Sequence, residues 1–514
     1  MKLQGSKLII RNTGILYAKT FITMGISLYS TRLILNTLGA NDFGIFSLIG
    51  GIVAMLTFLN NSMTQATQRF LTHSLGHGNK EKLRQIFNTS VLLHFIIGFF
   101  VVAIIELFGL WAFDSMLTIP IERIAIAKII FHCIVISTFF TIISVPYDAI
   151  INAHEHMLFD SILGILQSLG VLTIAILIGY VHSDKLLLYG TLMAALSFLL
   201  LIVRRVYCRV TYTVTKIHFK KYLKKTTIKE MLSFASWSFF SATTSLIGGY
   251  GVGVLLNSFF GARLNAAQGI ATQINGQISV FAVSMMKALS PQITKSEGAG
   301  ERQRMIKLAM KGSKFSFFLL TFFAMPVLIE APYILKLWLV NPPAYTFVFC
   351  RLVLIVALLS QISLPINSMV NAVGDIKMLS VFSSILFVMV IPITYLLFKL
   401  KYPPFWVYIV QIFSELGLLA LRLYFAKKTV KLSLKEFRNS VINPVLTLFF
   451  PLALIAIFPS IFLDESFFRL ALTIVSCTLT FILLMRYFVL DSEEKTMFKG
   501  YYIKLKTKLI IQKV

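Results

Sequence analysis

The chain has 514 residues, of which 57% are hydrophobic and 13% are charged, and its mean hydropathy is +0.82. This composition excludes a soluble globular protein. The formal net charge of +27 could indicate nucleic-acid binding, but the basic residues gather in short loops between apolar stretches, which excludes that interpretation as well.

Apolar stretches of about 20 residues recur along the whole chain, and each is long enough to cross a bilayer core as a helix. The basic segment 1–11 leads into the first stretch without a small-residue cleavage pattern, so we expect a retained helix rather than a signal peptide. We predict an all-α polytopic membrane protein with about fourteen spans, at 12–38, 43–68, 86–110, 123–148, 157–180, 185–207, 231–258, 264–292, 306–330, 346–370, 377–398, 405–426, 439–459 and 467–490.

The distribution of lysine and arginine predicts the orientation of these spans. Of the 48 basic residues, 36 fall in the loops and termini on one side, seven fall on the other side, and five lie within or beside spans. The positive-inside rule therefore places both termini in the cytoplasm. The excess charge needs no nucleic-acid partner, because anionic membrane lipids attract it.

The second half of the chain repeats the first. The pattern Ser144-x-Pro146 followed by Asn152-Ala153 returns 219 residues later as Ser363-x-Pro365 and Asn371-Ala372. Two further patterns recur at similar offsets: 35–40 returns at 256–262, and 72–78 at 294–300. Internal repeats of this size in membrane proteins commonly build two lobes around a substrate site at the bilayer midplane, which favours a transporter.

The repeat sets the expected domain boundaries. Six spans precede the basic segment, so the seventh starts on the same side as the first, and the two six-helix lobes form a parallel repeat. We expect an N-lobe at 1–207, a basic cytoplasmic linker at 208–230, a C-lobe at 231–426, two additional helices at 427–490, and a basic tail at 491–514 that lies on anionic lipid.

Amide side chains are concentrated in the second span and in its repeat counterpart, the eighth. Hydroxyl and glycine residues at helix contacts are explained by packing alone, but this many amides favour a hydrated cleft between the lobes. The amides expected to line it are Asn60, Asn61, Gln65, Gln68, Gln268, Gln273, Asn275 and Gln277.

Three basic residues lie in the first and eighth spans, and we expect Lys19, Arg32 and Lys287 to bind substrate. Snorkelling could explain each one singly. The first, second, seventh and eighth spans contain no Asp or Glu, so the three form a cationic path without a fixed counter-charge, and an anionic substrate is the simplest explanation.

The remaining charges indicate less. Glu415 and Arg422 are seven residues apart on one predicted helix and share a face; Glu415 is the carboxylate that we nominate for coupling to H⁺ or Na⁺. We expect Asp148 and Glu330 to be solvated at span ends, and His154, Glu155 and His156 to form a solvated loop rather than a metal site. The four scattered cysteines predict neither a disulfide nor a metal site, and no cofactor is expected.

The chain resembles the Wzx-type polysaccharide or O-antigen flippases of the multidrug/oligosaccharidyl-lipid/polysaccharide (MOP) exporter superfamily. The resemblance covers the full length, and rests on the fourteen spans, on Arg11-Asn12-Thr13 before the first span, and on 32–44, which ends in the turn Leu38-Gly39-Ala40-Asn41-Asp42-Phe43-Gly44. It implies a MATE-like fold in the bacterial cytoplasmic membrane. It also implies transport of an undecaprenyl-pyrophosphate-linked oligosaccharide by alternating access, in O-antigen, capsule or exopolysaccharide assembly, with the polysaccharide polymerase machinery left open as a further partner.

Three alternatives remain beside the flippase. A multidrug cation exporter of the same fold would use buried carboxylates, which the cleft helices lack. A lipid II flippase would also need a cationic cavity. A glycosyltransferase would need carboxylates facing a large loop, whereas all loops here are short, so we expect no enzyme activity.

Overall fold

The computed structural model describes residues 2–56, 58–115, 121–181, 184–260, 262–339, 343–492 and 494–496. Among these residues the secondary structure is helical throughout, with no strand. In chain order the long helices are α1 (Lys2–Leu56), α2 (Phe58–Gly76), α3 (Lys80–Ser115), α4 (Ile124–Ala153), α5 (Met157–Tyr180), α6 (Lys185–Thr211), α8 (Lys225–Phe260), α9 (Ala262–Gly298), α10 (Arg302–Leu339), α11 (Thr346–Val373), α12 (Lys377–Lys399), α13 (Trp406–Val430), α15 (Asn443–Phe462) and α16 (Phe467–Leu484). Short elements are η1 (Ile121–Arg123), η2 (Thr213–Thr215), α7 (Phe219–Tyr222), α14 (Leu434–Phe437), and two π-helical turns, η3 (Arg438–Ile442) and η4 (Met485–Val489).

The helices confirm the predicted all-α membrane fold. Eleven of the described helices are long and apolar enough to cross a membrane, judged by length and composition. The other three predicted spans, 12–38, 43–68 and 264–292, lie in α1, α2 and α9, which are helical but are not among the eleven. The predicted tail lies outside the described residues from 497 onward.

A glycine separates the first two predicted spans. Helix α1 is two helices joined across a kink at Gly39, whose φ of 79° is a backbone conformation that residues with a Cβ rarely adopt. Just after the kink, Asp42 binds Arg123, which also binds Asp184, the N-cap of α6. One arginine therefore ties the α1 kink to the start of α6.

The chain divides into two compact units that do not follow the linear boundaries of the repeat. Unit 1 comprises 1–243, 287–305 and 371–381, and unit 2 comprises 244–286, 306–370 and 382–514. Unit 1 therefore holds α1 to α7, the first half of α8, the last turns of α9 with the start of α10, and the turn that joins α11 to α12.

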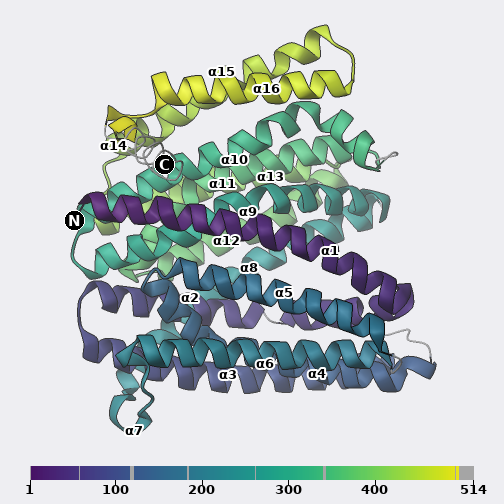
Figure 1. The fold of residues 1–514 in the computed structure, drawn as a ribbon. Coiled ribbons are helices and arrows are strands. Elements are labelled where there is room, and N and C mark those ends of the chain that lie inside the picture. The colour runs from purple at the N-terminus through teal and green to yellow at the C-terminus, as the bar shows by residue number, and fades with distance from the viewer. Residues whose placement is uncertain are drawn as a thin grey trace, which may run out of the picture. The chain divides into compact units, whose positions relative to one another are not determined.

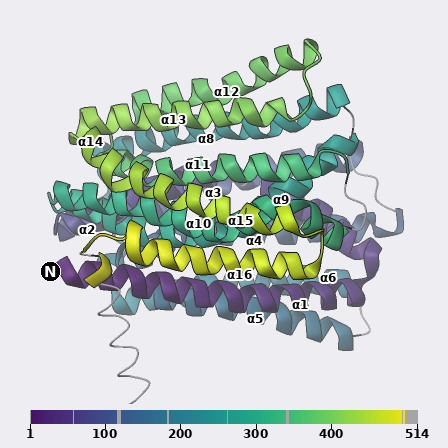
Figure 2. The same ribbon diagram turned by 90° about the horizontal axis from the view of Figure 1, so that it is seen from above.

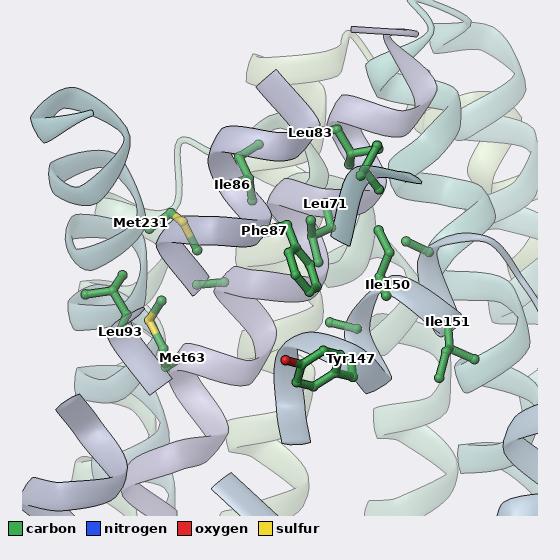
Figure 3. Close-up of a cluster of buried hydrophobic side chains, with 14 of the residues drawn as sticks. Met63, Leu71, Leu83, Ile86, Phe87, Leu93, Tyr147, Ile150, Ile151 and Met231 are labelled. Atoms are coloured by element: carbon green, nitrogen blue, oxygen red, sulfur yellow. The ribbon is translucent and has the colours of Figure 1, made fainter. Parts of the chain in front are cut away.

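Unit 1 packs α1 beside α5 and α4 beside both α3 and α6 (Figures 1 and 2). One core cluster joins α2, α3, α4 and the start of α8. Figure 3 shows Phe87, Leu71, Tyr147 and Ile150 gathered in this cluster, and the ring of Phe87 meets that of Tyr147 edge to face. The basic segment 204–229 begins in the last turns of α6 and ends in the first turns of α8. We call the end of the unit 1 helices at which this segment lies the basic end.

Unit 2 has its own core, in which Phe349 of α11 packs against Tyr408 of α13. Glu330 of α10 is fully buried, binds Arg469 of α16 at 2.7 Å, and accepts a hydrogen bond from Thr473. The expectation that Glu330 is solvated was therefore wrong. A second buried ion pair joins Lys314 of α10 to Glu494, so α16 and the chain that follows it are anchored to α10.

Candidate functional site

Two of the three predicted substrate-binding residues lie together. The Nζ atoms of Lys19 in α1 and Lys287 in α9 are 3.1 Å and 2.8 Å from the same carboxylate oxygen of Asp160. The side chain of Asp160 is 15% exposed, and those of Lys19 and Lys287 are 22% and 37% exposed. The three side chains form a partly buried cluster that we call the lysine–aspartate triad.

Local sequence explains why the triad forms. Asp160 lies in the first turn of α5, where the helix dipole stabilises a carboxylate. Gly164, one turn later on the same face, has no side chain, and Lys19 occupies the space where a Cβ would be. Beside the ionic contacts, Leu16, Met157 and Ala288 form a small buried apolar cluster that holds α1, α5 and α9 together.

The triad has one negative charge for two positive charges. The expectation of a cationic path without a counter-charge was therefore wrong, because α5 supplies a carboxylate that binds both lysines. The adjacent Asp148 is paired with Arg204 at 2.6 Å, and its side chain remains 33% exposed. Asp148 interacts electrostatically with Asp160 and Lys287, but its pairing with Arg204 leaves the net positive charge at the triad unchanged.

Arg32, the third predicted residue, does not join the triad. It follows Lys19 by 13 residues in the same helix, which is about 20 Å along the axis. Its side chain is exposed, and it forms no ion pair with any carboxylate in the described part of the chain. The structure therefore separates Arg32 from Lys19 and Lys287.

The predicted amides divide between the two units. Asn61 and Gln65 of α2 are exposed in unit 1, and Gln273 and Gln277 of α9 are exposed in unit 2. In each helix the exposed pair is spaced i, i+4 and shares a face. Exposed amides are costly against hydrocarbon, so both faces fit contact with water better than contact with lipid. That the two faces line one cleft remains a prediction.

The other four amides are less exposed. Asn60 is buried, and its Oδ1 atom has no hydrogen-bond partner. Gln68 and Gln268 are partly buried, and Asn275 accepts a hydrogen bond from Ser279 at 3.1 Å.

Glu415 lies in α13, and its Oε2 atom is buried without a hydrogen-bond partner. Among the described ion pairs there is none between Glu415 and Arg422. Arg422 instead donates a hydrogen bond to Ser363 of α11. The predicted role of Glu415 in ion coupling remains a prediction.

A second polar cluster at the basic end was missed by sequence reasoning. Glu155, in the turn between α4 and α5, is 2% exposed, and its carboxylate binds Lys295 at 3.2 Å and Gln292. The side chain of Asn12 donates to the backbone carbonyl of Glu155 at 3.2 Å. The expectation of a solvated loop was wrong here, because the end of α9 covers it. Asn12 belongs to the Arg11-Asn12-Thr13 pattern, which was the available signal.

The repeat counterpart of this turn is bound in a similar way. Arg69 of α2 donates to the carbonyl oxygens of Asn371 and Ala372, at 2.7 Å and 3.1 Å. Gly374 and Glu155, 219 residues apart, both have positive φ, at 100° and 62°. In each repeat, therefore, a turn with one positive-φ residue follows the fourth helix and receives a polar side chain from α2 or α9.

The comparisons with known proteins agree with this architecture. The sequence pattern of the MatE family matches residues 18–181 and, separately, residues 233–396, one match in each repeat. No curated protein sequence matched the chain.

Solved transporter structures share the fold. An outward-facing multidrug resistance MATE family transporter of the MOP superfamily is 14% identical, covering 83% of this chain and 96% of its own, with a TM-score of 0.67. A MATE structure in a bent conformation is 16% identical, with coverage of 83% and 97% and a TM-score of 0.69. A MOP superfamily transporter from Pyrococcus furiosus, described as having a binding pocket of reverse polarity, is 16% identical, with coverage of 84% and 97% and a TM-score of 0.66.

Both repeats match the family pattern, and together the matches cover more than half of the sequence. The chain therefore belongs to the MatE family.

Proposed function

We propose that this transporter is a flippase that carries an undecaprenyl-pyrophosphate-linked oligosaccharide from the cytoplasmic to the outer face of the bacterial cytoplasmic membrane. The observation that supports this proposal most directly is the lysine–aspartate triad. Two lysines share one carboxylate, so the cluster keeps a net positive charge and has capacity for an anionic group.

The triad also suggests how the substrate is captured. A pyrophosphate carries more charge than one carboxylate and has more acceptor oxygens, so it competes with Asp160 for both lysines. During this exchange the ammonium groups pass from one anion to another. Neither ammonium group is left unpaired in this partly buried site, where an isolated charge is costly.

The exposed amides of α2 and α9 would recognise the sugar part of the substrate. The exposed faces of α2 and α9 carry Asn61 with Gln65 and Gln273 with Gln277. Amide groups both donate and accept hydrogen bonds, which suits the hydroxyl groups of sugars. No bond is made or broken in this process. Alternating access of the two lobes would release the head group on the outer face.

Two other transport functions use related chemistry. A lipid II flippase would present the same pyrophosphate to the triad and would differ only in the sugar–peptide head group. A multidrug cation exporter is favoured by the carboxylate of Glu415, whose Oε2 atom has no hydrogen-bond partner, and by the structural likeness to a multidrug resistance transporter. The reverse polarity described for the Pyrococcus furiosus relative supports a change of substrate class within this fold.

Reconstitution tests the proposal directly. The full-length protein in proteoliposomes is given a fluorescent undecaprenyl-pyrophosphate oligosaccharide, and transfer between leaflets is followed by the access of an external quencher. We expect Lys19→Ala and Lys287→Ala each to lower the rate at least tenfold, because each removes a ligand of the pyrophosphate. Lys128→Ala is the matched control, since Lys128 is an exposed lysine of α4 outside the triad.

The outcomes separate the three candidates. Transfer of lipid II, but not of the oligosaccharide lipid, would select the lipid II flippase. Uptake of a cationic dye that is lost in Glu415→Gln, with no transfer of either lipid, would select the drug exporter. Equal rates for the Lys19→Ala, Lys287→Ala and control proteins would reject the role of the triad.

A further inference from the structure

A pocket of about 450 Å³ lies at the basic end of unit 1, and the triad residues are not part of it. It is formed where α6 ends and the chain turns back through η2. The residues that define its chemistry are Tyr147, Arg205, Arg209, Thr215, Lys216 and His218.

The pocket is strongly cationic. Arg205 and Arg209 are spaced i, i+4 and share one face of α6, and Lys216 adds a third positive charge from the chain that follows η2. No carboxylate is among the residues that line it. In the described part of the chain, none of these three cations forms an ion pair, so their charge is available to a ligand.

The backbone of the pocket is held in place by buried polar side chains. Asn88 of α3 is fully buried, donates to the carbonyl of Lys216 at 3.3 Å, and accepts from the amide of His218 at 2.7 Å. The buried hydroxyl of Thr215 donates to the carbonyls of Cys208 and Tyr212. The segment that carries Lys216 and His218 is therefore held in place before any ligand binds, which lowers the entropy cost of binding.

The surface next to the pocket is apolar. Leu199, Ile202, Val206 and Val210 follow α6 toward its end, and their exposed fractions are 56%, 40%, 55% and 82%. In a membrane-spanning helix such a row faces the acyl chains of lipid. Val206 and Val210 directly follow Arg205 and Arg209, so the basic side chains lie where the apolar surface ends, at the depth of the lipid head groups.

We propose that this pocket binds the phosphate head group of an anionic phospholipid in the adjoining leaflet, with the acyl chains against the apolar row of α6. Basic pockets at the ends of membrane helices are suited to this chemistry. A free phosphate ion would satisfy the arginines equally well but would leave the apolar row unused, and the lipid is therefore the favoured source.

The test compares two double variants of the full-length protein in detergent. Arg205→Gln/Arg209→Gln removes two charges from the pocket, and Lys224→Gln/Lys225→Gln removes two exposed charges from the same linker outside it. Native mass spectrometry measures retention of cardiolipin, phosphatidylglycerol and phosphatidylcholine. We expect the arginine variant to bind both anionic lipids at least tenfold more weakly, with the lysine variant close to wild type.

The other results overturn the proposal. Equal losses in both double variants would indicate diffuse attraction to the basic linker rather than a pocket. Unchanged binding in the arginine variant would place the lipid elsewhere. Displacement of the anionic lipid by millimolar inorganic phosphate would identify an anion site without lipid specificity. Should the arginine variant be unstable, Val210→Ser tests the acyl contact, and unchanged lipid retention in that variant counts against the proposal.

Discussion

Asp160 is the residue on which the charge of the candidate site depends. Sequence reasoning selected Lys19 and Lys287 by type and depth, and the structure brings them together. It missed Asp160 because the search for carboxylates covered only the helices expected to line the cleft. An acidic residue in the first turn of a helix is also ordinary, and gave no separate signal. Contacts across 141 and 127 residues cannot be inferred from one sequence.

Replacing Asp160 by Asn tests whether the carboxylate competes with the substrate. The variant keeps the shape of the side chain but removes the charge, so we expect a pyrophosphate-containing lipid analogue to bind about tenfold more tightly. Release should slow as a result, and the overall transport rate should fall. Binding to purified protein and transfer in proteoliposomes measure the two effects.

Asp375→Asn is the control for this experiment, because Asp375 is an exposed aspartate in the turn before α12. Weaker binding of the analogue to Asp160→Asn than to the control protein would mean that the carboxylate helps to hold the substrate. The competition between Asp160 and pyrophosphate would then be incorrect.

His154 makes the stability of the basic end sensitive to pH. Its pKa is lowered from 6.5 to about 4, first by burial and then by the positive charges of His156 and Lys295. The folded state binds this proton less readily than the unfolded state. The contribution of neutral His154 to the free energy of unfolding is therefore full above pH 6.5 and is lost as the pH falls from 6.5 to about 4. His154→Phe keeps the stacking on Tyr212, whose ring centroid is 4.4 Å away. We expect the melting temperature of this variant to fall less on acidification, and an unchanged pH profile would exclude His154 as the cause.

Helices α2 and α9 pack closely at their ends, and the two contacts are repeat counterparts. A Cβ at Gly76 would collide with the carbonyl of Lys295, and a Cβ at Gly298 would collide with the carbonyl of His73. The sequence pattern already contained Gly76 and Gly298 as a matched pair 222 residues apart. It did not reveal that each glycine meets the other repeat, because symmetry in a sequence does not state which copies are in contact.

The glycine contact predicts an effect on the basic end of unit 1. Gly298→Ala forces the two helix ends apart at a backbone atom that cannot rotate away, so a cost of about 1–3 kcal/mol is expected. Gly269→Ala, in the same helix, is the control, because a Cβ there would meet no atom within 4 Å. In proteins with the native cysteines removed, Ser296→Cys reports the change, since Ser296 is 2% exposed. We expect faster maleimide labelling with Gly298→Ala only, and equal rates would contradict the close contact.

At the level of helices, sequence periodicity and hydropathy were sufficient to locate the predicted spans along the chain. The predicted span 157–180 coincides with α5, and other predicted spans end within a few residues of the observed helices. The longer differences arise where a helix continues beyond the apolar stretch: α2 and α9 continue as polar helices at the basic end, and α10 continues to Leu339 at its C-terminal end. Hydropathy marks where a helix leaves the hydrocarbon, whereas packing of polar turns against protein determines where the helix itself ends.

The topology of the whole molecule depends on whether α1, α2 and α9 cross the membrane. Fourteen crossings place both termini on one side, whereas the eleven strongly apolar helices alone would place them on opposite sides. Helices α2 and α9 carry the amides, and α9 also carries a triad lysine, so in these two helices the features expected for transport also weaken the membrane signal. A transport path needs polar side chains, whereas a lipid-facing span needs apolar ones, because polar groups are costly in contact with hydrocarbon.

Cysteine accessibility decides between these topologies. In proteins with the native cysteines removed, Asn79→Cys reports the turn between α2 and α3, Lys495→Cys the chain after α16, and Lys401→Cys the turn between α12 and α13; all three positions are exposed. If α1, α2 and α9 all cross the membrane, the positive-inside rule places the first two sites in the cytoplasm and the third outside. A membrane-impermeant maleimide should then label only Lys401→Cys in intact spheroplasts and the other two only in inverted vesicles. Labelling of Asn79→Cys and Lys495→Cys from opposite sides would show an odd number of crossings between them, and one of the polar helices could not then be a membrane span.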